Sequence, residues 1–218
     1  MIIDHNNMMY RKKWEYAGEH KFNGAYYYSR EIVKNIIPNV KTTRNWVTIN
    51  SVTPQVNHAI VFIHDNLKPA ITLRWLAYSR DLILVCGVEK TMDKVRHLGR
   101  PVYLPLSVDV DYVKSFKTKK TKDTAYVGRK GKKGTAKLPK DIDYISGVTR
   151  AELLTEMAKY KKVYAVGRCA IEAKILGCKV LPYDPRYPDP SVWKVLDNKD
   201  AAKILQEEID KIDKKEVE

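Results

Sequence analysis

The fold of this chain is decided by Gly167-Arg-Cys-Ala-Ile-Glu-Ala-Lys-Ile-Leu-Gly-Cys-Lys-Val180. The apolar run before it predicts a strand over Lys162–Val166, which leads into a turn at Gly167 and a short helix over Ala170–Leu176. A glycine then predicts the end of this helix, just before a second strand over Cys178–Pro182. This strand–turn–helix–strand unit is typical of a parallel α/β sheet, with the Gly167 turn at the carboxyl end of a strand.

The position of this turn indicates a candidate binding site. Ligands of open parallel sheets bind at the carboxyl ends of the strands. Backbone amides at the start of the following helix attract anions, so Gly167 and Arg168 are candidate phosphate-binding residues. Glu172 lies about one turn into the helix, where its carboxylate can accept hydrogen bonds from sugar hydroxyls. A surface glutamate without any ligand is the alternative interpretation.

The alternation of strands and helices extends over most of the chain. The further predicted strands are Asn45–Asn50, His58–His64, Asp81–Val85, Val102–Leu106, Thr124–Val127 and Asp143–Ile145. The further predicted helices are Tyr28–Ile36, Pro69–Tyr78, Glu89–Leu98, Thr149–Tyr160 and Lys199–Asp213. This order predicts an α/β protein with two Rossmann-like parallel-sheet domains, residues 1–110 and 123–218, joined by a linker over residues 111–122.

A strongly basic segment interrupts this alternation between residues 114 and 140. It contains eleven Lys and Arg residues and a single acidic residue, Asp123. A glycine-rich loop after a strand exposes backbone N–H groups, and neighbouring cations neutralise a diphosphate. The candidate phosphate-binding residues of this loop are Gly128, Arg129, Lys130 and Lys133. A solvated loop without a ligand would have the same composition.

A second set of candidate residues follows the most apolar predicted strand. His64 ends the predicted strand His58–His64 and Asp65 follows it, so we expect them at a carboxyl end of the first sheet. Either side chain can act as a general base toward an acceptor hydroxyl. An Asp-Asn pair after a strand is also a frequent turn, which leaves a structural role open.

Composition narrows the classes of partner. The chain has 218 residues, 44% of them apolar, and a net charge of +14, which predicts attraction to DNA or another polyanion. Arg11, Lys12 and Lys13 beside Tyr10 and Trp14 add to this charge. No His, Cys and Asp cluster has the spacing of a metal site. No signal-peptide pattern or membrane-spanning apolar run is visible, so we expect a cytoplasmic protein with buried thiols at two of its three cysteines.

Three segments together resemble the nucleotide-sugar glycosyltransferases of the GT-B fold. The run Ala170-Ile-Glu-Ala173, with Gly177 and Val180, resembles their donor site, in which the glutamate holds the ribose. Val127-Gly-Arg129 followed by Lys130 resembles the loop that grips the donor diphosphate. Leu104-Pro-Leu-Ser-Val-Asp109 resembles the turn into the carboxyl-terminal domain, with Ser107 in place of the usual glycine.

The resemblance implies two Rossmann-like domains that face a cleft. It also implies metal-independent transfer of a sugar from a nucleotide-diphosphate donor such as a UDP-sugar, with no other cofactor. Members that glucosylate viral DNA make DNA a candidate acceptor. Two positions depart from the family pattern: Tyr164 stands where many retaining members have a second glutamate, and Arg168 replaces a small residue. A non-catalytic nucleotide- or nucleic-acid-binding protein and a sugar-nucleotide epimerase remain alternatives on the same scaffold. The sequence does not define the oligomeric state.

Overall fold

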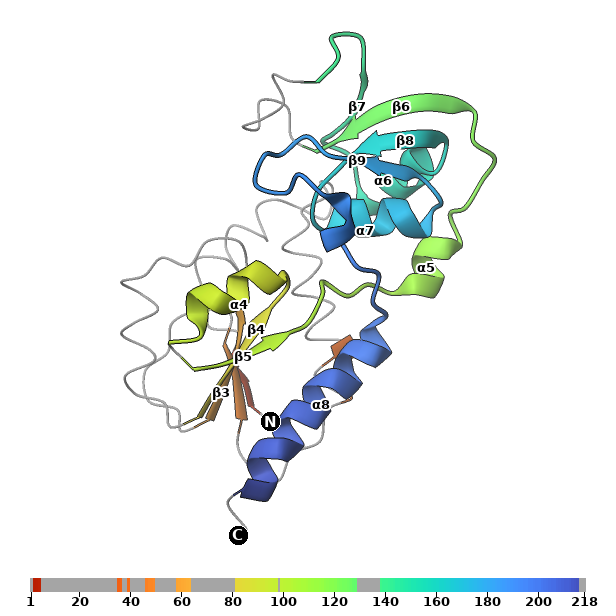
Figure 1. Cartoon of the computed structure of the whole chain (residues 1–218). Coiled ribbons are helices and arrows are strands. Elements are labelled where there is room, and N and C mark those ends of the chain that lie inside the picture. Colours follow the sequence, from red (N-terminus) through yellow and green to blue (C-terminus); the bar gives the residue numbers. More distant parts are fainter. Residues whose placement is uncertain are drawn as a thin grey trace. The chain divides into compact units, whose positions relative to one another are not determined.

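The computed structural model describes residues 2–4, 35–36, 39, 46–49, 58–63, 81–97, 99–128 and 138–215. These residues form two parallel sheets with helices between their strands, which confirms an α/β fold (Figure 1). They group into two compact units. Unit 1 holds the described residues up to Pro105 together with those from Lys199 onward, and unit 2 holds Leu106–Asn198.

The sheet of unit 1 follows the chain order without a reversal. Its parallel strands lie in the order β1-β2-β3-β4-β5. They span Ile2–Asp4, Trp46–Ile49, His58–Ile63, Asp81–Cys86 and Arg100–Tyr103. Residues Ile83 to Cys86 of β4 are at most 1% exposed, as expected for a parallel strand that is covered on both faces. Because the strand order does not reverse, these five strands offer no topological switch point.

Two described helices belong to unit 1. Helix α4, Glu89–Val95, contacts β4 and β5. Helix α8, Asn198–Lys215, is amphipathic. Its buried apolar residues are Ala201, Ala202, Leu205 and Ile209. An ion pair of 2.6 Å between Arg100 Nη2 and Glu208 Oε2 ties α8 to the first residue of β5.

The sheet of unit 2 does reverse its strand order. Its parallel strands lie in the order β7-β6-β8-β9. In chain order they span Lys122–Val127 (β6), Asp143–Ile145 (β7), Tyr160–Tyr164 (β8) and Lys179–Leu181 (β9). The chain therefore places β7 on one side of β6, and then crosses back over β6 to place β8 and β9 on its other side. This reversal places a topological switch point between β6 and β8.

The helices of unit 2 are short. They are α5 (Val110–Lys114), α6 (Arg150–Met157), α7 (Arg168–Ile175) and the 3-10 turn η4 (Pro190–Val192). Helix α6 begins at Thr149, where a capping box with Glu152 is present. The connections through α6 and α7 both step across the sheet in the same direction, so right-handed crossovers put the two helices on one face.

The segment predicted as a linker contains regular structure. Residues 111–122 contain most of α5 and the first residue of β6, and they group with unit 2. Lys120 fixes this segment, because its ammonium group donates to Ala158 O and Leu176 O at 2.9 Å each and contacts Cys178 Sγ at 3.2 Å. Ala158 and Leu176 are the C-cap residues of α6 and α7, so one lysine holds both helix ends.

The segments by which the chain enters and leaves unit 2 are paired with each other. Val108 N donates to Leu196 O at 3.1 Å, and Asn198 N donates to Val108 O at 3.2 Å. The Asp197 carboxylate also accepts from Val110 N at 3.2 Å. The predicted helices Tyr28–Ile36 and Pro69–Tyr78 lie outside the described residues, except for residues 35–36.

Candidate functional site

The carboxyl edge of the unit 2 sheet brings together two segments that the sequence singled out. Strand β6 ends at Val127, directly before Gly128, and β8 ends at Tyr164, three residues before Gly167. The two strands are parallel neighbours, with Tyr126 opposite Tyr164. Gly128 and Gly167 therefore follow adjacent strands at the same edge of the sheet, on the two sides of the switch point.

Helix α7 begins at this edge without a side-chain cap. Its N-cap is Gly167, in the left-handed region with φ 62°, and its carbonyl accepts from Ala170 N at 3.0 Å. By contrast, the Thr149 hydroxyl and the Glu152 carboxylate occupy the amino end of α6. A glycine cap supplies no acceptor of its own, and such a helix start suits an anionic ligand.

Glu172 lies one turn into α7, and its side chain is fully buried between two arginines. Its Oε1 accepts from Arg168 Nε at 2.9 Å and lies 3.2 Å from Arg150 Nη2. The guanidinium of Arg150 in turn lies over the Tyr112 ring of α5, 4.9 Å from its centroid. The other carboxylate oxygen of Glu172, Oε2, is buried and has no hydrogen-bond partner in the described part of the chain. It is therefore a buried acceptor that lacks a donor among the described residues.

Gly128 lies against Tyr126, which in turn packs against a second tyrosine. A Cβ at this position would lie 2.6 Å from the Tyr126 hydroxyl oxygen, so the backbone fits here only with a glycine. The ring of Tyr126 packs edge-on against Tyr183, with 5.1 Å between the centroids. Burial raises the pKa of both phenols, so both remain neutral at physiological pH.

A further cation follows β9 at the same edge. The buried carboxylate of Asp184 accepts from Arg186 Nε at 3.0 Å and from Arg186 Nη2 at 2.7 Å. The Arg186 side chain remains 51% exposed, so a fixed guanidinium faces solvent there.

The predicted site residues divide into two groups. The structure describes Gly128, Gly167, Arg168 and Glu172, all in unit 2. The others lie outside the described residues and stay predictions: His64, Asp65, Arg129, Lys130 and Lys133.

Sequence reasoning did not identify Arg150, Tyr126 or Arg186. The capping box at Thr149 puts Arg150 at the first position of α6. Nothing local in the sequence links that position to Glu172, because the contact joins two different helices.

The reactivity of the three thiols of the chain tests the described packing. The structure confirms that Cys86 and Cys178 are buried, whereas Cys169, the second residue of α7, is half-buried. Burial raises the pKa of Cys86 to about 11 and also raises the pKa of Cys178. We therefore expect Cys169 alone to react quickly with a thiol reagent such as DTNB at pH 8, and the other two to react only in denaturant. Fast reaction of two or three thiols in the native protein would contradict the described packing.

In the described part of the chain, no group of three or more His, Cys, Asp or Glu residues is arranged to hold a metal ion, and no helix is long and apolar enough to cross a membrane. Comparison of the whole chain with protein-family models, with curated proteins and with solved structures gives no match.

Proposed function

We propose that unit 2 binds a nucleoside-diphosphate sugar at its carboxyl edge, and that the protein transfers the sugar to an acceptor. The observation that carries this proposal is the switch point between β6 and β8. An uncapped helix start and a buried, unsatisfied carboxylate oxygen of Glu172 belong to the same edge. An anion and a hydroxyl are the two groups that these features accept, and a nucleoside diphosphate carries both.

Each residue of the edge has a role in this proposal. The diphosphate binds at Gly167 and the amino end of α7, and Arg129 with Lys130 or Lys133 neutralises its charge. A ribose hydroxyl donates to Glu172 Oε2, while Arg168 holds the carboxylate through Oε1. Gly128 leaves room for the Tyr126 hydroxyl, and its lack of a side chain permits close approach of a ligand to the backbone.

The transfer step needs a base and a stabilised leaving group. In the proposed reaction His64 or Asp65 takes the proton of the acceptor hydroxyl as its oxygen bonds to the anomeric carbon of the sugar. The bond from that carbon to the donor diphosphate breaks, and the cations of the edge stabilise the departing diphosphate. The acceptor is DNA or another polyanion, given the net charge of +14. We further propose that the chain forms two Rossmann-like domains that face a cleft. We propose the cytoplasm as its location.

Calorimetric titration tests the donor site. UDP, GDP and their glucose conjugates are titrated into the wild-type protein, Glu172→Gln and Arg129→Gln, with Glu156→Gln as the matched control. Glu156 is a half-exposed glutamate of α6 with lysine partners, so its replacement should leave binding unchanged. We expect one nucleotide to bind and both site variants to weaken it by a factor of about 10 to 100, the loss of one hydrogen bond to a charged group.

Protection of a thiol gives a second readout that needs no variant. A nucleotide at the start of α7 should slow the labelling of Cys169 by DTNB. No heat of binding and no protection with any of the four compounds would overturn the proposed donor site.

A non-catalytic nucleotide-binding protein is the second candidate. It is favoured by Tyr164, because a tyrosine packed against the cluster of Tyr126 and Tyr183 occupies the position of the second glutamate of retaining members. Asp65→Asn separates the two candidates. Donor binding without turnover in the variant, alongside turnover in the wild type, supports the enzyme. Binding without turnover in both proteins supports the alternative.

A further inference from the structure

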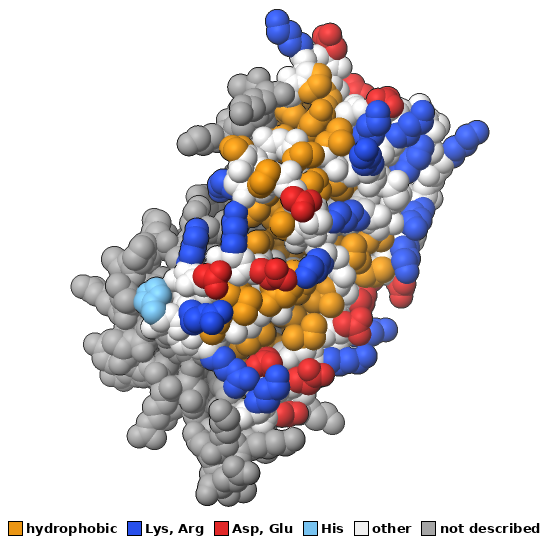
Figure 2. Space-filling model, viewed as in Figure 1, with side chains coloured by type: hydrophobic (Ala, Val, Ile, Leu, Met, Phe, Trp, Pro, Cys, Tyr) orange, Lys and Arg blue, Asp and Glu red, His pale blue; other side chains and the backbone are white. Residues whose placement is uncertain are grey.

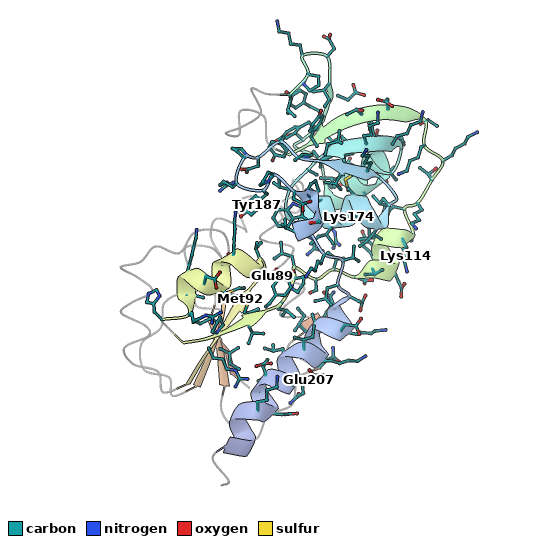
Figure 3. The ribbon with its side chains drawn as sticks, in the orientation of Figure 1. Glu89, Met92, Lys114, Lys174, Tyr187 and Glu207 are labelled. Carbon is teal, nitrogen blue, oxygen red and sulfur yellow. The ribbon has the colours of Figure 1, made fainter. Side chains whose placement is uncertain are left out.

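The opposite edge of the unit 2 sheet, where its strands begin, carries a group of lysines. Two lie in the run that enters β6, two near the start of β8, and one at the first position of β9. We call them the amino-edge lysines: Lys117, Lys119, Lys161, Lys162 and Lys179. All but Lys162 are exposed, and the Lys162 side chain is 45% exposed. Figure 2 shows Lys and Arg side chains gathered on the side where the chain runs from α5 toward β6, and Figure 3 labels Lys114 at the end of α5.

These lysines depart from the usual composition of a parallel sheet. One row across the sheet, Ala125, Val163 and Val180, is at most 9% exposed. The adjacent row of opposite orientation consists of Thr124, Lys162 and Lys179. Parallel strands usually bury apolar residues on both faces, and like charges directly opposite each other on neighbouring strands are destabilising. The pairing of Lys162 with Lys179 therefore favours an anionic partner over this row.

The acids of the region neutralise these charges only in part. Glu156 is shared by Lys122 and Lys159, and Asp123 lies 3.7 Å from Lys162. Asp123 also interacts electrostatically with Lys161. The remaining three amino-edge lysines, Lys117, Lys119 and Lys179, have no ion pair with any residue in the described part of the chain. The result is a positively charged surface on a rigid sheet edge.

We propose that the amino-edge lysines form a docking surface for duplex DNA, bound through its phosphates. The large hydrophobic residues exposed on the described part of the chain are Tyr112, Tyr144 and Val195, none of which lies on β6, β8 or β9. Of the rings beside these lysines, Tyr160 is 3% exposed, and Phe116 is half-buried and packs edge-on against Tyr112. A surface without an exposed apolar side chain lacks the means to insert into a membrane, and one without an exposed ring lacks a platform for unpaired bases. Cations alone suit the phosphate backbone of a duplex.

The docking surface does not depend on the proposed nucleotide site. Strand β6 has six residues, so the two edges of the sheet lie about 17 Å apart at the usual rise of a strand. A protein that binds DNA at one edge and no nucleotide at the other is therefore possible, as is the reverse.

Fluorescence anisotropy with a labelled duplex of mixed sequence, about 20 base pairs long, tests this surface. The test variant combines Lys117→Gln, Lys161→Gln and Lys179→Gln. The matched control combines Lys94→Gln, Lys203→Gln and Lys211→Gln, which removes three exposed lysines from α4 and α8 and gives the same net charge. We expect the test variant to bind at least about 10-fold more weakly in 50 mM NaCl, and the control to change affinity by less than about 2-fold. The slope of log K against log salt should also fall by about 2 to 3 in the test variant, one unit for each lost phosphate contact.

Three outcomes would overturn the proposal: no binding of the duplex by the wild-type protein, equal losses in the two triple variants, or tight binding of the single strand alone. Titration of the test variant with UDP keeps this proposal separate from the proposed function. Retained nucleotide binding with lost DNA binding supports both, whereas DNA binding by a wild-type protein that ignores all nucleotides supports the docking surface alone.

Discussion

Replacement of Glu172 by alanine should lower the free energy of unfolding by about 3 to 5 kcal/mol. The carboxylate is fully buried, and its two partners are buried as well, with the Arg168 side chain 3% and the Arg150 side chain 11% exposed. Removal of the glutamate leaves two guanidinium groups near each other without their shared counter-charge. Urea denaturation followed by circular dichroism measures the change, and Glu172→Gln should cost less than alanine because it keeps the shape and one hydrogen bond.

The matched control is Glu156→Ala on α6. Glu156 also contacts two basic side chains, Lys122 and Lys159, but its side chain is 39% exposed. Ion pairs at such positions contribute about 0 to 1 kcal/mol, so we expect a small loss. Equal losses for the two alanine variants would show that the arginines do not enclose Glu172 as described.

Replacement of Lys120 by methionine should lower the free energy of unfolding by about 2 to 4 kcal/mol. Methionine keeps a flexible stem of similar length, so the change chiefly removes the ammonium group. Two carbonyls on buried residues, Ala158 and Leu176, then lose a charged donor at the ends of α6 and α7. Thermal unfolding measures the change, and a shift of several degrees in Tm is expected for a chain of this size.

The neighbouring Lys119→Met provides the control for this variant. Lys119 is exposed, so its replacement should change stability by less than about 0.5 kcal/mol. If Lys120→Met were as stable as Lys119→Met, the hydrogen bonds of the Lys120 ammonium group to Ala158 O and Leu176 O would contribute nothing to stability in solution.

The strands could be predicted from the sequence where apolar residues dominate them. Strand β4 was expected over Asp81–Val85 and extends one residue further, to Cys86. Strand β8 was expected over Lys162–Val166 but spans Tyr160–Tyr164. The two lysines in its first half suggest a later start, yet they are tolerated because the strand begins at an exposed edge and Tyr160 pairs with Lys122.

The short helix α5 could not be predicted for a different reason. It has five residues with no apolar period, and it depends on the Asp109 carboxylate, which accepts from Tyr112 N at 2.9 Å. In the candidate site, local patterns identified the two glycine turns and Glu172. They could not identify Arg150 as the partner of Glu172, because tertiary packing alone brings α6 and α7 together there.

The pairing of Val108 with Asp197 has a consequence for the architecture of the gene product. The described residues of unit 2 fall between Leu106 and Asn198, and the two ends of this segment lie hydrogen-bonded to each other. A segment whose two ends adjoin resembles an insertion into the rest of the chain, because its removal leaves a gap that a very short peptide can close. Its two neighbouring ends thus suit this segment to circular permutation and to insertion into a surface loop of an unrelated protein.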